Sequence, residues 1–246
     1  MSAASSARMQ EVLLGGVQHY RADRAACQAL LEVLPHAAAL AARSRSFLED
    51  TVCRLARADT TQFVELGCGL PRRDNVHTIA RRWQPDARTL YLDNDPVVLA
   101  HAYAELEESE QEAVTDADLN RTAVLDLPLW RSHFDPGRPV DILAVGLLEH
   151  LPDESVDTLI CSLPAASTLT VSALACENAP RAAAIDEIMH QLTPEAWGRV
   201  RDAASLSALL PGLCLHHPVG DGSGPYLATG TLRIPPTSGP YAEHGR

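Results

Sequence analysis

The chain has the length of a single large domain and is strongly acidic. Its 246 residues are 46% hydrophobic, and 20 basic residues against 32 acidic ones give a formal net charge of −12. This hydrophobic content can fill one core, so we expect one folded domain. The acidic balance predicts no nucleic-acid partner, because phosphate backbones bind clustered Lys and Arg. Every basic residue is arginine, which excludes enzymes that need a Schiff-base or phosphate-binding lysine.

No segment of the sequence has the length of a membrane span. The apolar run from Asp141 to Leu148 is far shorter than the roughly 20 residues that a span needs, and the N-terminus lacks a secretory signal pattern. We therefore expect no membrane association and a cytoplasmic protein. The six cysteines show no metal-ligand spacing and are expected to be buried free thiols. His216 and His217 are adjacent on a predicted strand and point to opposite faces, so no metal site is expected.

The N-terminal part is predicted to be helical. Between Arg24 and Arg57, apolar residues recur at helical spacing and Pro35 interrupts them, which indicates two helices. The end of the chain is rich in Pro, Gly and Ser, which is typical of disorder. The predicted divisions are a helical cap or lid at 1–59, a main domain at 60–234 and a disordered tail at 235–246.

After residue 60 the chain alternates between strand and helix patterns. The predicted strands begin at Thr61, Arg88, Glu112, Val140 and Ser167, and helices begin at Val76, Pro96 and Glu154 between them. This alternation predicts a doubly wound, mostly parallel α/β sheet with helices on both faces. A helix from Thr193 and two strands from Leu213 and Tyr226 complete the prediction, the two strands as an antiparallel edge.

A glycine turn and two acidic strand ends form the candidate binding site. Parallel sheets bind ligands beyond the carboxyl ends of their strands, where the strand order reverses. Gly67 and Gly69 in "ELGCGLP" allow a tight turn and the close approach of a ligand. Asp93 lies 24 residues after Gly69, where a carboxylate can accept both hydroxyls of a ribose. Asp118 can accept the adenine amino group, while the N–H of Leu119 donates to a ring nitrogen.

Two features favour S-adenosylmethionine over a nicotinamide dinucleotide. The dinucleotide fingerprint needs a third glycine for close helix packing, and Arg72 occupies that position. Glu65, just before the turn, suits a cationic amino group or sulfonium better than a pyrophosphate. Within and after the turn, Cys68 and Asn75 are also cofactor candidates, and Asn75 is expected to cap the next helix with its side chain.

The segment "FVELGCGLPRRDNVHTIARRWQPDARTLYLDNDPVVLAHA" closely resembles a family of actinobacterial S-adenosylmethionine-dependent methyltransferases that was long catalogued as a domain of unknown function. The likeness extends from Leu13 to Pro152 and includes "GLPxxxNVH" from Gly69 to His77. It implies a class I, Rossmann-like methyltransferase fold with S-adenosyl-L-methionine as cofactor. The positions it implies are Glu65, Gly67 and Gly69 around the methionine, Asp93 and Asn94 at the ribose, Asp118 and Leu119 at the adenine, and the backbone of Gly146 and Leu147 near the sulfonium.

Four side chains are candidates for contact with the methyl acceptor. Glu149 and His150 follow the fourth predicted strand, where either can act as a general base, cap the next helix or face solvent. His19 and Tyr20 follow a glycine pair and either belong to a lid over the cofactor or begin a surface helix. Residues 17–19 depart from the family pattern, which leaves acceptor recognition open.

The leading hypothesis is an S-adenosylmethionine-dependent methyltransferase that acts on a small molecule in specialised metabolism. A protein that binds S-adenosylmethionine or its demethylated product without catalysis remains an alternative, as does an enzyme that uses the sulfonium for another transfer or a cyclisation. The sequence leaves the oligomeric state open, a homodimer included. Replacement of Asp93 by alanine is predicted to weaken cofactor binding with little effect on stability, because a strand-end carboxylate is expected to face the cleft.

Overall fold

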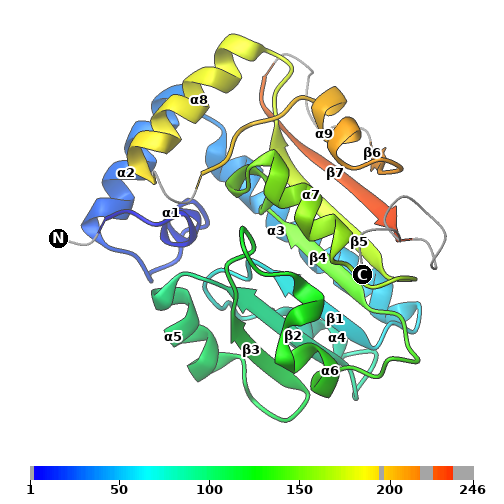
Figure 1. Cartoon of the computed structure of the whole chain (residues 1–246). Helices are drawn as coiled ribbons and strands as arrows, with labels where there is room; N and C mark the ends of the chain where they lie inside the picture. Colours follow the sequence, from blue (N-terminus) through cyan, green and yellow to red (C-terminus); the bar gives the residue numbers. More distant parts are fainter. Residues whose placement is uncertain (1–2, 194–196, 217–223, 235–246) are drawn as a thin grey trace.

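One sheet of seven strands forms the centre of the fold across residues 3–193, 197–216 and 224–234, which the computed structural model describes (Figure 1). In chain order the strands are β1 (Gln62–Leu66), β2 (Arg88–Asp93), β3 (Glu112–Asp116), β4 (Asp141–Val145), β5 (Thr168–Ala175), β6 (Cys214–His216) and β7 (Tyr226–Arg233). Their spatial order is β3-β2-β1-β4-β5-β7-β6, so the direction of winding reverses between β1 and β4. Such a reversal creates the crevice in which parallel sheets bind ligands.

Alternating side chains of the parallel strands pack into two cores. Strands β1 to β5 pair in parallel, whereas β7 pairs antiparallel with β5, and β6 with β7. Successive residues of a strand point to opposite faces. Val64 accordingly joins the core on one face and Phe63 the core on the other, and both are fully buried. The predicted doubly wound sheet with an antiparallel edge is confirmed.

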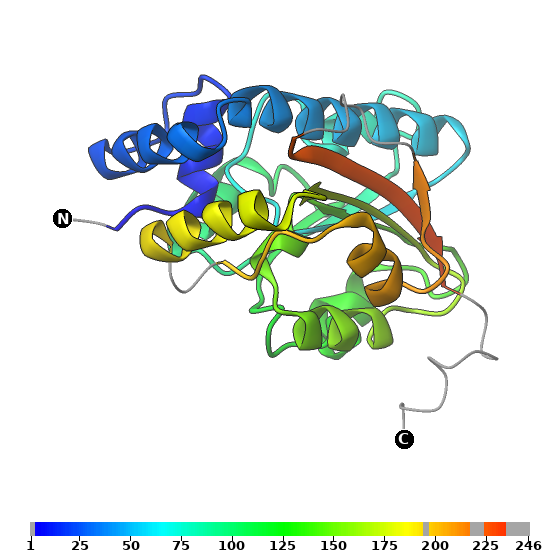
Figure 2. The same ribbon diagram turned by 90° about the horizontal axis from the view of Figure 1, so that it is seen from above.

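Helices cover both faces of the sheet, as Figure 2 shows for α3 and α7. On one face lie α3 (Ala37–Arg57), α4 (Val76–Ala80) and α5 (Pro96–Glu105), and on the other α6 (Pro128–His133), α7 (Asp153–Cys161) and α9 (Ala203–Leu209). Val52 of α3 belongs to the same core as Phe63, and Leu159 of α7 belongs to the same core as Val64. Single 3-10 turns occur at Val124–Asp126 and Leu148–His150.

A third core joins three helices at one end of the sheet. The helices are α1 (Ser6–Leu13), α2 (Arg21–Val33) and α8 (Ala179–Leu192), which lie together in Figures 1 and 2. Met9, Leu30 and Ile185, one from each helix, are buried in this core. The predicted pair of N-terminal helices around Pro35 is confirmed as α2 and α3. Only α3 belongs to the layers of the sheet, since α1 and α2 pack beside α8.

The chain after Thr193 differs from the prediction. In place of a helix beginning there, α8 ends immediately before Thr193, and residues 197–200 are not helical. Thr193 and Pro194 fit the start of a helix, because threonine is a common N-cap residue and proline is favoured at the first helical position, so the local pattern does not explain the difference. Gly198 lies against another segment so closely that a Cβ there would be 2.4 Å from the carbonyl oxygen of Leu151. Packing of this non-helical segment on the turn after β4 therefore replaces the predicted helix.

The described helices, the cysteines and the C-terminal residues bear on three further predictions. Among the described helices none is by itself long and apolar enough to cross a membrane, and only α2 with α3, which meet at a bend of 103°, reach that length and composition together. The six cysteines are free thiols. Cys27 and Cys176 are buried, whereas Cys161 and Cys214 are exposed, contrary to the prediction. The predicted tail from residue 235 and His217 lie outside the described residues.

Candidate functional site

A cavity of about 640 Å³ lies at the carboxyl ends of the parallel strands. Turns after β1, β2, β3 and β4 line one side of it, and residues of α1, α2, α3 and α8 line the other. Its volume is in the range of small-molecule sites, roughly 300–1,000 Å³. The lining includes all but one of the predicted cofactor residues, namely Glu65, Gly67, Cys68, Gly69, Asp93, Asn94, Asp118, Leu119, Gly146 and Leu147.

Glycines shape the turns after β1 and β4. Gly67 and Gly69 have φ of 64°, and Gly146 has φ of 67°, in the left-handed region that favours glycine. A Cβ on Gly67 would lie 3.0 Å from the side chain of Leu147, so the two turns approach each other closely. The absence of side chains here leaves backbone groups open to a ligand.

The carboxylate of Asp93 ties the ends of β1 and β2 together. Its Oδ2 accepts a hydrogen bond from the N–H of Gly69 at 2.9 Å. Its Oδ1 accepts from the N–H groups of Asn94 and Asp95 at 2.9 and 3.0 Å. Burial raises the pKa of Asp93, and these three hydrogen bonds oppose the rise. These hydrogen bonds change the expectation of little effect on stability: we now expect alanine at this position to destabilise the fold, because three backbone donors would lose their acceptor.

Glu65 is a buried acid that faces the cavity. It is 7% exposed, and within the described residues no hydrogen bond reaches its carboxylate. Burial raises the pKa of Glu65 to about 7, the charge of Arg45 opposes this rise, and that of Asp93 adds to it. A strongly shifted acid in a cavity is a common property of functional sites. A cationic ligand group would stabilise its ionised form.

Arg45 of α3 adds a positive charge that the sequence analysis missed. It lines the cavity, donates from Nε to Glu49 at 2.8 Å, and donates from Nη2 to the carbonyl of Asp74. Ala41 and Leu48, one helical turn away on each side, are buried. A charged residue on the buried stripe of an amphipathic helix is the signal that could have identified it.

Asp118 and Leu119 line the cavity shortly after the end of β3. The backbone N–H of Ala117 donates to the carbonyl of Asp93 at 3.0 Å, which joins this turn to the end of β2. One oxygen of Asp118 accepts from the N–H of Asn120 at 3.0 Å. The predicted adenine-binding pair therefore lies beside the predicted ribose-binding residue.

The turn after β4 brings two predicted catalytic candidates to the cavity. Glu149 and His150 both line it. Oε2 of Glu149 is buried, and it has no hydrogen-bond partner among the residues that the structure describes. The ring of His150 meets that of Trp197 edge to face, with centroids 5.1 Å apart. Both side chains are thus placed to contact a second ligand beside the cofactor residues.

Arg201 holds this turn in place. It is 3% exposed, and its guanidinium donates to the carbonyls of Leu148 and Leu151 at 2.6 and 2.7 Å and to Asp153 at 2.7 Å. Burial alone would raise the pKa of Asp153, but the hydrogen bonds and charge of Arg201 hold that pKa below its ordinary value. Arg201 is not among the predicted site residues, because nothing in the neighbouring sequence indicates partners about 50 residues away.

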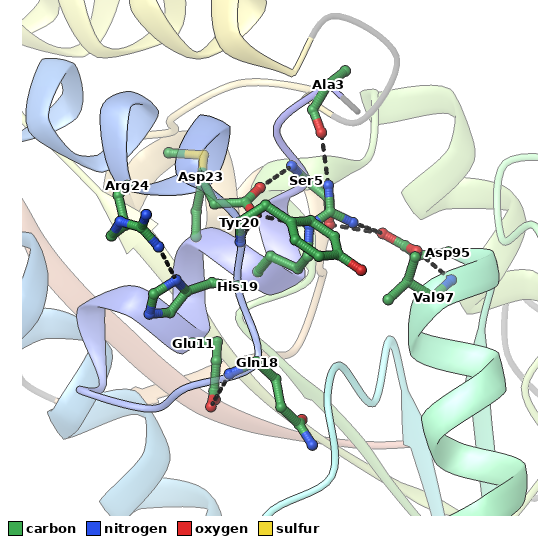
Figure 3. A network of polar contacts seen from close by, with 12 residues as sticks. Ala3, Ser5, Glu11, Gln18, His19, Tyr20, Asp23, Arg24, Asp95 and Val97 are labelled. Carbon is green, nitrogen blue, oxygen red and sulfur yellow. Dashed lines mark hydrogen bonds and ion pairs between the residues drawn. The ribbon is translucent and has the colours of Figure 1, made fainter. Parts of the chain in front are cut away.

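Helix α1 is connected to two of the turns that carry predicted cofactor residues, those after β1 and β2. The hydroxyl of Ser5 donates to Asp95, the N-cap residue of α5, at 2.7 Å, and Figure 3 shows the two side by side. At the other end of α1, Arg72 of the turn after β1 donates to Glu11. Residues 3–14 supply part of the cavity lining. The helix therefore covers the cavity and is fastened at both ends.

A buried ion pair holds α1 against α2. Nε of Arg8 and Oδ2 of Asp23 are 2.9 Å apart, and the two side chains are 4% and 0% exposed. The carboxylate of Asp23 also accepts from the backbone N–H groups of Ser5 and Tyr20 (Figure 3). One carboxylate thus organises the start of both helices.

Comparison with known proteins places the chain in a family. A family profile described as S-adenosyl methyltransferase matches residues 1–220. The chain belongs to this family. A protein of Mycobacterium ulcerans (strain Agy99), described as an S-adenosyl-L-methionine-dependent methyltransferase, is 34% identical over 174 residues, which cover 67% of this chain and 52% of the relative. One of Mycolicibacterium paratuberculosis with the same description is 26% identical over 184 residues, covering 72% and 54%. The chain spans about half the length of these curated relatives.

Two crystal structures share the fold of this S-adenosyl methyltransferase family member along nearly its whole length. A protein from Thermobifida fusca, described as a methyltransferase, is 28% identical with a TM-score of 0.81, covering 95% of this chain and 96% of that one. A protein of the DUF574 family from Streptomyces avermitilis is 28% identical with a TM-score of 0.80, covering 95% and 98%. The resemblance, the class I fold and S-adenosylmethionine as the family's cofactor are confirmed.

Three predicted site residues of this family member do not line the cavity. Nδ1 of His19 lies 3.0 Å from Arg24 on the outside of the N-terminal helices, and Tyr20 is 53% exposed (Figure 3). Oδ1 of Asn75 accepts from the backbone N–H of Arg72 at 2.8 Å, and it does not cap α4 as predicted. His19 and Asn75 are engaged by Arg24 and Arg72, and the ring of Tyr20 faces the guanidinium of Arg8, so we assign none of the three to the site.

Proposed function

We propose that the protein binds S-adenosylmethionine in this cavity and transfers its methyl group to a small molecule of specialised metabolism. The observation that carries the proposal is the buried, cavity-facing carboxylate of Glu65 beside the positive charge of Arg45. The carboxylate of Glu65 can pair with the amino group of a methionine moiety, and the guanidinium of Arg45 can pair with its carboxylate. The size of the cavity, which is lined from both sides, supports a small acceptor.

The remaining cofactor contacts follow from the order of the turns. Asp93 is held by three backbone donors with its carboxylate at the cavity, where it is placed to accept ribose hydroxyls. Asp118 and the N–H of Leu119 lie next along the sheet, in the position of an adenine. The open backbone at Gly67 and Gly146 leaves room for the methionine chain between β1 and β4.

The protein's own part in the reaction is orientation and proton removal. When bound, S-adenosylmethionine supplies a methyl group on a cationic sulfur that is already activated for transfer. Glu149 and His150 hold the hydroxyl or amine of the acceptor by hydrogen bonds and take the proton that it loses. Arg201 is a positioning residue, because it fixes the turn that carries both. The walls of the cavity orient the acceptor beside the cofactor.

Helices α1 and α2 form the cap of the site in this proposal. Residues of α1 line the cavity, and its two ends are joined to the turns after β1 and β2. A cofactor beneath the helix can exchange only when at least one of these connections opens. The cap function thus rests on α1 and its anchors in place of the side chains of His19 and Tyr20.

Incubation with methyl-labelled S-adenosylmethionine and pooled metabolite extracts tests the proposal. We expect a labelled product and S-adenosylhomocysteine, identified by mass spectrometry, and much less of both with Glu65→Gln. Methylthioadenosine as the nucleoside product would instead show that the sulfonium serves a different transfer. Tight binding of S-adenosylhomocysteine with no product from any extract would show a binding protein without catalysis. The identity of neighbouring genes tests the assignment to specialised metabolism.

A further inference from the structure

The cavity has an apolar half that the cofactor residues do not occupy. This half is formed by side chains of α1, α2 and α8, among them Met9, Leu13, Leu30, Leu34, Ile185 and Met189. Across the described residues, α2 and α8 contribute no charged side chain to the lining. The charged groups of the cavity are concentrated at the strand ends, on α3 and at the end of α1 next to the turn after β1.

Polar groups meet the apolar half at one place, the turn after β4. Trp197 forms the wall there, and its Nε1 donates to Asp186 of α8 at 2.9 Å, which fixes the indole. His150 packs edge to face on this indole. Glu149 lines the cavity at the same place, and its buried Oε2 has no hydrogen-bond partner among the described residues. A molecule in the apolar half that carries one donor can hydrogen-bond to the carboxylate of Glu149.

We propose that this apolar half is the acceptor site and that the acceptor is a neutral, largely apolar molecule whose hydroxyl group faces Glu149 and His150. The inference rests on the proposed function, since the cofactor takes the other half. A charged acceptor would leave its charge against Met9, Leu30 and Met189 without a partner, which is unfavourable in an apolar environment. A hydroxyl is a neutral donor and brings no charge into the apolar half.

The test uses 2-naphthol as the probe and the full-length protein saturated with S-adenosylhomocysteine. Calorimetric titration compares it with 2-methoxynaphthalene, which lacks the donor, and with 2-naphthoate, which carries a charge. We expect 2-naphthol to bind about tenfold more tightly than either. Equal binding of 2-naphthoate, or no saturable binding of 2-naphthol, would overturn the inference. The preceding titration with S-adenosylhomocysteine separates the two claims, because its failure would overturn the proposed function instead.

Variants at the wall locate the probe. Met189→Glu is expected to weaken 2-naphthol binding by about tenfold or more while S-adenosylhomocysteine binding stays within about twofold, and Met189→Leu is the matched control that retains both. If Met189→Glu does not fold, Leu13→Glu on the partly buried face of α1 makes the same test. Glu149→Met is expected to remove the preference for 2-naphthol over its methoxy analogue. Unchanged 2-naphthol binding with a charge at either wall position would refute the location.

Discussion

Replacement of Glu65 by glutamine should stabilise the protein without ligand and lower its affinity for the cofactor. Glu65 is 7% exposed, and its pKa of about 7 compares with an ordinary value of 4.5. That difference corresponds to about 3 kcal/mol of unfavourable free energy for the ionised form in the empty site. Glutamine keeps the shape and removes the charge, so it removes this cost.

The sign of the effect depends on pH. Between pH 4.5 and about 7 the folded protein holds a proton that the unfolded chain has released, so the free energy of unfolding falls as pH rises through this window. The cost is fully present above pH 7 and absent below pH 4.5. We expect Glu65→Gln to raise Tm by roughly 5 to 10 °C at pH 8 and to leave it unchanged at pH 4.

Ligand binding should respond in the opposite direction. The amino group of S-adenosylhomocysteine pairs with an ionised carboxylate in the wild type and with a neutral amide in the variant. Loss of the charged partner is expected to weaken binding roughly ten- to a hundredfold at pH 8. Wild-type affinity should fall as pH is lowered from 8 to 6, because Glu65 takes up a proton, and the affinity of the variant should not.

Thermal melts and calorimetric titrations at pH 4, 6 and 8 measure both effects. Glu32→Gln is the matched control, since Glu32 is an exposed carboxylate on α2 and should change neither quantity. If Glu65→Gln has wild-type Tm at pH 8, the carboxylate is not desolvated as the structure shows. If its affinity and pH dependence equal those of the wild type, Glu65 does not contact the amino group.

Three further outcomes are expected. Asp93→Ala should lower S-adenosylhomocysteine affinity roughly ten- to a hundredfold and Tm by roughly 5 °C, because three backbone donors lose their acceptor; an unchanged melting curve would contradict those hydrogen bonds. Arg201→Met should lower Tm by roughly 5 °C and reduce turnover with the identified acceptor, while S-adenosylhomocysteine affinity stays within about twofold. An equal loss of affinity would argue against a positioning role confined to the turn after β4. The double variant Ser5→Ala with Glu11→Gln should speed S-adenosylhomocysteine dissociation about fivefold or more in stopped-flow measurements. Dissociation at the wild-type rate would show that α1 does not control exchange.

Local sequence determined the sheet and the cofactor side of the site. Buried β-branched runs, the glycines at 67 and 69, and Asp93 at a strand end follow from neighbouring residues, and the carboxyl ends of parallel strands necessarily meet at one edge. Local patterns predicted a helix after Thr193 that the structure does not have, because Gly198 packs there against Leu151 of a distant segment. Helix α8 was not predicted, although asparagine and proline, here Asn178 and Pro180, are common at the start of a helix.

Tertiary structure alone decided which side chains complete the cavity. Ser5 and Asp95 are 90 residues apart in the chain, and Arg201 meets the turn after β4 across about 50 residues. His19 is of a residue type that is common in catalytic sites, but its side chain lies outside the cavity and contacts Arg24. The physical reason is that the patterns of strands and turns depend on near neighbours in the sequence. Contacts such as those of Ser5 and Arg201, and the apolar wall of the cavity, exist only after distant segments have packed together.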